Sequence, residues 1–492
     1  MGNLFKRMNR KEDPKVYESK DSKMVRSMTT KDFLALGVGT IVSTAIFTLP
    51  GVVAANNAGP AVTISFLLAA IVAGLVALGY AEMASAMPFA GSAYSWINVI
   101  FGEFWGWVAG WALLAEYFIA VAFVAAGLSA NFRGLIAPLG INIPTALSNP
   151  ISAPGGFVDI CTVVIILIVA FLITRGDNKT SKIENVLVIL KVLAILVFIF
   201  VGLFAIHIQN YVPFVPAPHT NPDGTAFGGF GGIYAGVSVI FLSYIGFDSI
   251  AANSAEAKNP QKTMPRGIIG SLVIAVTLFV AVSLVLVGMF KYTNYANNAE
   301  PVGWALRQSG HPYVASGVQI VAVVGMFTAL IGMMMAGSRL LYSFGRDGML
   351  PKFLGKVSDK HKLPVNAILT ITVISVLIGA FLTFNFLSQL ISAGTLIAFM
   401  FVSIGIYPLR KREGKDIKMP GFKMPFFPVM PALGFLASLW VFWGLDADAK
   451  LYALIWFIVG MVVYFAYGMH NRAKTQAAEL RDKNNDFDNK IE

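Results

Sequence analysis

Charged residues and cysteine are scarce in this chain of 492 residues. Only 13% of the residues are Asp, Glu, Lys or Arg, whereas 56% are hydrophobic, and the mean hydropathy is +0.70. Cys161 is the single cysteine, which excludes an intrachain disulfide and disfavours a metal cluster. The five histidines lie far apart in the sequence, so we predict no metal site and no cofactor.

The motifs of pumps and enzymes are missing as well. The chain has no G-x-x-x-x-G-K-[ST] phosphate loop, which disfavours an ATP-driven pump. It also has no Ser/His/Asp or metal-binding constellation, so we predict that it is not an enzyme. The first 31 residues contain nine Lys or Arg and no apolar run, which argues against a secretory signal. We expect residues 1–31 to form a basic cytoplasmic arm.

Long apolar runs dominate the rest of the sequence. A helix that crosses a bilayer needs roughly 20 mostly apolar residues. Twelve runs qualify and predict an all-α integral membrane protein with twelve transmembrane helices over residues 32–470, followed by a cytoplasmic tail at 471–492. The runs begin near Phe33, Ala61, Phe104, Phe157, Glu184, Gly231, Gly267, Tyr313, Pro364, Phe386, Phe427 and Leu451.

The basic residues predict how the chain lies in the membrane. With twelve spans, the two termini and the alternate loops hold 32 of the 37 Lys and Arg, the opposite loops hold four, and Lys191 lies inside a span. Cytoplasmic loops carry such an excess, so we expect both termini in the cytoplasm and the protein in the cell membrane. The charge is spread over short loops, which favours contact with anionic lipid over nucleic-acid binding.

Two spans are interrupted at matching places. The first span, residues 33–56, contains GVGTIVSTAIF at 37–47, and the sixth, residues 231–253, contains FLSYIGFD at 241–248. At membrane depth a helix can unwind only where protein or a water-filled cavity satisfies its backbone. Freed amides and carbonyls suit the two charged ends of a small zwitterion such as an amino acid. Broken helices 1 and 6 predict a 5+5 inverted repeat over residues 32–206 and 231–410, with two appended helices at 425–470.

Two connecting segments have their own patterns. Residues 88–96 are rich in turn-forming residues and predict a short interfacial or re-entrant segment with Tyr94 and Trp96 at headgroup level. Residues 207–232 are rich in Pro, Gly and Asn and suit either a plain connector or an outer lid.

Several motifs resemble those of the amino acid–polyamine–organocation (APC) superfamily. They are FLSYIGFD at 241–248 followed by Glu256, Asn-Pro and Met-Pro; GYAE at 79–82 with Pro88 and Gly91; and Ser-Arg at 338–339 with GRDGMLP at 345–351. The motifs occur in the family's order, and the resemblance extends over about residues 30–470. Within the superfamily the chain is similar to the cationic amino acid transporter branch, and most of all to branched-chain amino acid permeases of lactic acid bacteria.

This resemblance implies a substrate site at the two interruptions. The amides that would hold the substrate carboxylate are those of Ser43, Thr44 and Ala45, and the carbonyls that would meet its ammonium group are those of Ile41, Leu242, Ser243 and Ile245. Relatives often have Gly-Thr-Gly or a similar run where this chain has Ser-Thr-Ala. Losing the two glycines adds side-chain bulk and removes conformational freedom beside the carboxylate.

Lys191 is the strongest single-residue hypothesis. It lies about nine residues into the fifth span, roughly 13 Å from the cytoplasmic end at 1.5 Å per residue. Ionisable groups inside a membrane are functional hypotheses by default, and burial disfavours the charged amine and so permits proton release. The alternative is that the side chain snorkels to an interface. By the resemblance, the ammonium group replaces a sodium ion beside the first interruption, with Thr328 as a neighbour.

Three acidic residues are further candidates. Glu116 lies deep in the third span and suits a proton relay, a substrate contact or a structural hydrogen-bond partner. Glu82 lies near the cytoplasmic end of the second span, where a structural or gating contact is favoured. Asp347 lies beside Arg346 in an inner loop and is a candidate to pair with the basic arm as an inner gate.

We therefore predict a proton-coupled, secondary active uptake permease for branched-chain or other small apolar L-amino acids. The expected pocket faces are apolar, with Ile119, Ala120, Met326 and Phe327 as candidates, and only Glu116 is placed to pair with a cationic substrate. The alternatives are a cationic amino acid transporter, an exchanger, a channel and an amino acid sensor, although the short termini disfavour the sensor. The expected partners are the amino acid, protons and anionic lipid, and we expect a monomer.

Overall fold

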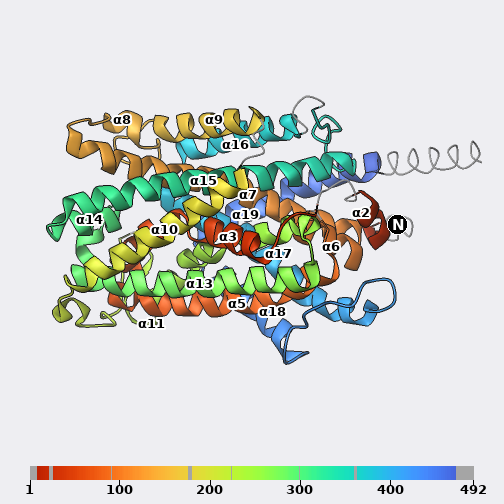
Figure 1. Ribbon diagram of the computed structural model, residues 1–492, viewed down its shortest axis with the longest axis horizontal. Helices are drawn as coiled ribbons and strands as arrows, with labels where there is room; N and C mark the ends of the chain where they lie inside the picture. Colours follow the sequence, from red (N-terminus) through yellow and green to blue (C-terminus); the bar gives the residue numbers. More distant parts are fainter. Residues whose placement is uncertain are drawn as a thin grey trace, which may run out of the picture.

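The computed structural model describes residues 8–20, 26–89, 91–175, 180–222, 224–298, 300–358 and 363–472. The long helices lie roughly side by side along the longest axis of the molecule (Figure 1). The described chain begins and ends at the same end of this bundle, where Arg472 forms an ion pair with Glu12 at 2.6 Å. We refer to this end of the bundle as the terminal end and to the opposite end as the loop end.

Within the described residues, eight helical stretches are long and apolar enough to cross a membrane, and three shorter apolar helices accompany them. The protein is thus an all-α, multi-pass membrane protein. One stretch holds α3 (Thr30–Ile41), α4 (Thr44–Val53) and α5 (Val62–Ala86), and the others lie on α7 (Glu103–Ile136), α10 (Thr180–Leu203), α11 (Gly229–Ile240) with α12 (Phe247–Ala252), α13 (Pro260–Met289), α15 (Pro312–Arg346), α17 (Phe384–Arg412) and α19 (Ala447–Val463). The shorter helices are α9 (Ile160–Arg175), α16 (Val365–Phe381) and α18 (Val429–Trp443).

Both segments that the sequence marks as interruptions leave helical geometry. Val42 and Ser43 separate α3 from α4. In the other segment α11 passes into a 3-10 turn, Phe241–Tyr244, then Ile245 is extended and Gly246 has a φ of 132° before α12 begins. Only glycine adopts such a φ at little cost, so the chain passes from the 3-10 turn into α12 on a residue without a Cβ.

Helix α7 runs through the centre of the bundle. Its most apolar window is buried over its whole length. It packs against α15 and α17 along its sides and against α19 through tryptophans. A helix that is apolar all round and buried is a scaffold against which other helices rest. Side chains that α7 directs toward the interruptions are therefore held in fixed positions.

The short elements cap the two ends of the bundle. They are α2 (Pro14–Lys20) and α6 (Ser92–Ile100) at the terminal end, and α8 (Thr145–Ser148), α14 (Pro301–Gln308) and the antiparallel pair of β1 (His219–Thr220) with β2 (Ala226–Phe227) at the loop end. The rings of Tyr94 and Trp96 on α6 are both fully buried, so they contact protein at this end of the bundle. Trp96 Nε1 donates to the Met87 carbonyl at 2.7 Å, so protein rather than a headgroup satisfies it.

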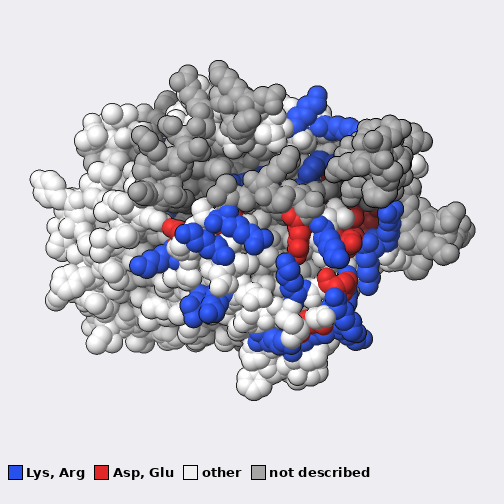
Figure 2. Space-filling model, turned by 45° about the vertical axis from the view of Figure 1, so that its right-hand side comes forward, with Lys and Arg blue, Asp and Glu red and all other residues white. Residues whose placement is uncertain are grey.

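Basic side chains are unevenly distributed over the surface. Figure 2 shows Lys and Arg gathered toward the terminal end, among a smaller number of acidic groups. The flank away from that end is largely without them on the face shown. An uncharged flank suits contact with lipid chains, and a basic end suits the water and headgroup region.

Candidate functional site

The two interruptions touch one another near the middle of the bundle. The Thr40 hydroxyl donates to the Gly246 carbonyl at 3.3 Å, and the Ser249 hydroxyl lies 3.3 Å from the Thr40 oxygen. A Cβ added to Gly246 would lie 3.1 Å from the backbone nitrogen of Ile41. The glycine therefore permits both the positive φ and the close approach of the two broken helices.

The first interruption presents the amino end of α4 to this junction. The first amides of a helix have no partners within the helix, and a partial positive charge gathers there. Ser43 is the N-cap residue, and its side chain makes no capping hydrogen bond within the described part of the chain. Thr44 and Ala45 are buried. The Ser43 amide donates to the Ile41 carbonyl, so the amides of Thr44 and Ala45 are the ones suited to an anion such as a carboxylate.

The bulk that Ser-Thr-Ala adds at this position is accommodated by α7. The Thr44 hydroxyl lies 3.5 Å from the Val124 carbonyl, and the Thr44 methyl group occupies the space that a Cβ on Gly127 would need. The threonine side chain therefore packs against a glycine of the scaffold helix. No sequence pattern pairs these two positions, because Gly127 lies in an ordinary apolar run.

The carbonyls proposed for the ammonium group already have partial partners. The Ile41 carbonyl accepts from the Ser43 amide at 2.9 Å, and the Leu242 carbonyl accepts from the Ile245 amide at 3.1 Å. A carbonyl oxygen has two lone pairs, so each retains one for a ligand. The buried Ser243 hydroxyl has no hydrogen-bond partner among the described residues.

Lys191 joins the site from α10. It is fully buried, and its Nζ donates to the Gly39 carbonyl at 2.9 Å. Gly39 lies in the last turn of α3, where helix carbonyls lack partners within the helix. The ammonium group is therefore bound inside the protein beside the first interruption and does not snorkel to an interface.

The stem of Lys191 lies across a glycine of α15. A Cβ added to Gly325 would lie 2.5 Å from the lysine Cε and 3.2 Å from Cδ. The Thr328 hydroxyl donates to the Gly325 carbonyl at 2.8 Å. Thr328 thus binds the backbone of Gly325, the residue on which the Lys191 stem packs. The sequence did not single out Gly325.

A carboxylate holds the second interruption. Asp248 is buried and accepts from the Gly246 amide at 3.0 Å and from the Tyr117 hydroxyl at 2.8 Å. The fully buried Glu116 on α7 lies within electrostatic range of Asp248. Within the described residues, the two oxygens of Glu116 have no partner with hydrogen-bond geometry. The sequence showed Asp248 in an apolar span but gave it no role.

A polar cavity of about 710 Å³ lies toward the loop end of the site. Val52 of α4 and Val239 of α11 line it, so it lies along the halves of both interrupted helices that face the loop end. The segment at 207–232 packs beside it, with the Asn221 side chain donating to the Asn56 carbonyl at 2.8 Å. Its polar lining residues include Asn56, Asn57, Ser388, Gln389, Asp446 and Asp448.

Polar contacts tie the helices together at the terminal end. The Arg339 guanidinium lies 3.4 Å from Glu256, and the Ser254 hydroxyl donates to the Phe89 carbonyl at 3.0 Å. Asp347 accepts from the Tyr94 hydroxyl at 2.9 Å and from Arg346 at 3.0 Å. These contacts join the segment that follows α12 to Phe89 and α15, and join α15 to α6.

The amino-terminal arm takes part in this closure. Tyr17 of α2 is buried and stacks on Phe89 with ring centroids 5.5 Å apart. Burial raises the pKa of the Tyr17 phenol well above its usual range, and the nearby Asp347 raises it further, so the phenol stays neutral. Asp347 thus lies beside the arm next to an uncharged tyrosine.

Glu82 forms a separate tie. Its carboxylate pairs with Arg410 of α17 through two hydrogen bonds of 2.8 and 2.9 Å and accepts from the Met424 amide at 2.6 Å. Such two-pronged pairs fix orientation as well as distance. Glu82 therefore locks the end of α5 to α17, away from Lys191 and the interruptions.

The expected apolar pocket faces are dispersed. Met326 is buried on α15 next to Gly325. Ile119 instead lines an apolar cavity among α7, α16, α17 and α19, and no residue of either interruption lines that cavity.

Comparisons with known proteins identify the family. A family model described as amino acid permease matches residues 28–467. The branched-chain amino acid permease BcaP of Lactococcus lactis subsp. cremoris is 62% identical over 94% of this chain and 99% of its own length. A methylthioribose transporter of Bacillus subtilis is 37% identical over 92% and 95% of the two chains. The branched-chain amino acid permease BcaP of Bacillus subtilis is 35% identical over 91% and 94%.

Proposed function

The chain belongs to the amino acid permease family, and from this premise we propose that it takes up branched-chain or other small apolar L-amino acids by proton-coupled alternating access. The contact between the two interrupted helices carries the proposal. It gathers the amino end of α4 and the free lone pairs of carbonyls in one buried place. A free amino acid has the complementary pair of charges.

In this proposal the backbone holds both ends of the substrate. The amides of Ser43, Thr44 and Ala45 bind the carboxylate, and the carbonyls of Ile41, Leu242, Ser243 and Ile245 face the ammonium group. Backbone groups recognise what all amino acids share, so specificity must come from the side-chain pocket. The names of the two branched-chain relatives favour Leu, Ile and Val, and the methylthioribose relative supplies a competitor to test.

Lys191 is the proposed proton carrier. Its ammonium group is buried and binds the Gly39 carbonyl, as a bound sodium ion would. Glu116 serves as a second relay group, because it is buried beside Asp248. Thr328 supports Lys191 through the Gly325 carbonyl.

The proposed architecture has twelve spans arranged as a 5+5 inverted repeat with two appended helices. Residues 32–206 and 231–410 are the repeats, residues 425–470 form the last two helices, and the arm and the tail are cytoplasmic. The basic terminal end in Figure 2 supports this orientation in the cell membrane and contact with anionic lipid. Glu82 and Asp347 hold the inner gate closed, and we expect a monomer.

Uptake of labelled isoleucine into proteoliposomes tests the proposal. We expect saturable accumulation driven by an inward proton gradient, competition by leucine and valine, and no stimulation by sodium. Potent inhibition by arginine alone would discard the branched-chain assignment in favour of a cationic transporter, and inhibition by methylthioribose alone would reassign the substrate. Binding without flux would identify a sensor, and unsaturable flux a channel. Exchange that needs substrate on both sides would identify an exchanger.

A further inference from the structure

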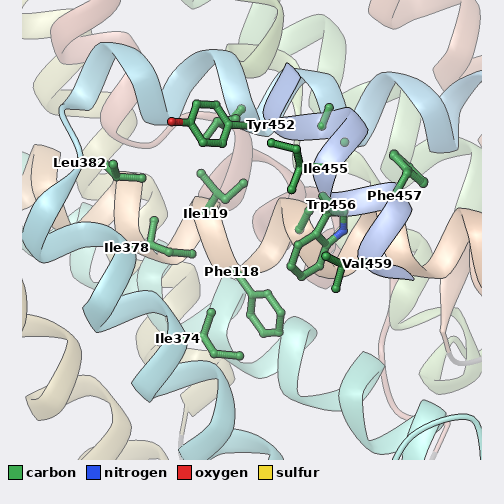
Figure 3. Close-up of a pocket in the computed structure, with 14 residues that line it drawn as sticks. Phe118, Ile119, Ile374, Ile378, Leu382, Tyr452, Ile455, Trp456, Phe457 and Val459 are labelled. Carbon is green, nitrogen blue, oxygen red and sulfur yellow. The ribbon is translucent and has the colours of Figure 1, made fainter. Parts of the chain in front are cut away.

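A second cavity lies away from the interruptions, on the side of α7 that faces α16 and α19. Its volume is about 320 Å³, at the lower end of the range of roughly 300–1,000 Å³ for small-molecule pockets. Side chains from these helices converge on it in Figure 3, and they are hydrocarbon apart from the Tyr452 hydroxyl and the Trp456 indole nitrogen. The main walls are Phe118, Ile119, Ile374, Ile378, Trp456 and Val459.

Small residues create the space, and a tryptophan pair holds it open. Ala115, Gly394 and Ala453 line the cavity where larger side chains would fill it. The Trp111 and Trp456 indoles each donate to the other's carbonyl, at 2.8 and 2.9 Å, with ring centroids 4.6 Å apart. These reciprocal bonds fasten α19 to α7, so the cavity cannot close by drawing the two helices together.

The cavity opens to the outside of the bundle. Ile455 and Val459 line it, and these side chains are 47% and 46% exposed. Both lie on a stretch of α19 that is apolar enough to span a membrane, so their surroundings are lipid chains. An apolar cavity of this kind does not hold water. Leaving it empty forfeits van der Waals contacts along every wall.

We infer that this cavity binds one acyl chain of a membrane phospholipid. The chain lies along α19 from Tyr452 to Val459, a rise of about 10 Å at 1.5 Å per residue. Tyr452, 51% exposed and near the start of α19, marks the headgroup side, where tyrosine is favoured. Moving an acyl chain from the bilayer into the cavity gains no hydrophobic free energy, because both surroundings are hydrocarbon. The favourable binding free energy comes from van der Waals contacts that fill the preformed cavity.

The bound chain also lies behind a functional turn of α7. Ala115 lines the cavity directly before Glu116, and a Cβ added to Gly394 would lie 3.6 Å from the Glu116 amide. The following residue, Tyr117, holds Asp248. Lipid packed here supports the segment that carries both side chains.

Photolabelling of the full chain in proteoliposomes tests this site. The probe is a phospholipid with a diazirine group midway along one acyl chain, and labelled residues are mapped by mass spectrometry. We expect label concentrated on cavity residues such as Ile378 and Trp456. Ala453→Phe fills the space and should abolish that label. The neighbouring residue Leu454 is 57% exposed and does not line the cavity, so Leu454→Phe should leave the label unchanged.

The melting temperature of each purified variant establishes that it is folded. Ile374→Trp fills the cavity from α16 if Ala453→Phe fails to fold. Label spread evenly over the lipid-facing helices would overturn the inference. So would label that persists in a folded, filled variant, or cross-links that join two copies of the chain at this cavity. Labelling needs no substrate, so its failure is distinct from a failure of transport.

Discussion

The two interruptions are stabilised by opposite charges. At the first, the freed group is the Gly39 carbonyl at the carboxyl end of α3, and the Lys191 ammonium binds it at 2.9 Å. At the second, the group is the Gly246 amide before α12, and the Asp248 carboxylate binds it at 3.0 Å. The cation comes from α10, a helix distant in sequence, whereas the anion comes from the interrupted helix itself.

This difference shows how a broken helix is tolerated at membrane depth. A break frees carbonyls on one side and amides on the other, and buried polar groups without partners are costly. The Gly246 amide has a local partner two residues away, so that half is a built-in turn. The Gly39 carbonyl depends on a side chain from α10, and that side chain is the proton carrier of the proposed function. Under that proposal, coupling belongs to the first interruption and rigidity to the second.

Replacing Lys191 should have the largest effect on this comparison. Lys191→Met keeps a long apolar stem but removes the ammonium group, so the Gly39 carbonyl loses its partner and the proton carrier is gone. We expect accumulation of isoleucine driven by a pH gradient to fall to background. The measurement is uptake into proteoliposomes with an imposed gradient.

Lys450→Met serves as its control. Lys450 lies near the start of α19, away from the interruptions, and donates to the Trp443 carbonyl at the end of α18. Replacing it should leave accumulation unchanged. Normal gradient-driven accumulation in Lys191→Met would refute the proton role of the lysine.

Replacing Asp248 should impair the second interruption without changing the coupling. Asp248→Ala leaves the buried Gly246 amide and the Tyr117 hydroxyl without their acceptor, at a cost of about 1–3 kcal/mol for an unsatisfied buried group. We expect a lower melting temperature and slower uptake, with the same dependence on pH. Asp248→Asn keeps an acceptor oxygen and should be milder in both assays. A shifted pH dependence in Asp248→Ala would give this carboxylate a coupling role.

The sequence predicted the interruptions and the burial of Lys191 because each violates a strong rule. Helix-poor residues and a lone cation stand out in apolar spans of roughly 20 residues. The partners were less visible, since Gly127 and Gly325 look like ordinary small residues of membrane helices. Their role depends on which helices pack together, which periodicity does not give. The burial of the Tyr94 and Trp96 rings was not visible for the same reason, because an aromatic pair suits a buried helix as well as an interface.

Adding a methyl group at Gly325 should disturb the first interruption less than losing the lysine. In Gly325→Ala the new Cβ meets the stem of Lys191, which must leave its rotamer at a cost of about 1 kcal/mol. We expect uptake to fall roughly fivefold, since 1.4 kcal/mol is tenfold. The pH dependence of uptake should shift as the ammonium group moves. Gly317→Ala on the same helix meets nothing within 4 Å and is the matched control. Equal effects of the two changes would exclude Gly325 as a positioning residue.

Removing the hydroxyl that joins the two interruptions should have the smallest effect. Thr40→Val keeps the shape of the side chain but removes the bond to the Gly246 carbonyl. That bond is long, at 3.3 Å, and the Ser249 hydroxyl also binds the same carbonyl, so the cost should be about 0.5 kcal/mol, or roughly twofold in uptake. Thr277→Val is the control, because that exposed hydroxyl binds only within its own helix among the described residues. A tenfold loss in Thr40→Val would mean that the two interruptions act as one unit and that the separation of coupling from rigidity is wrong.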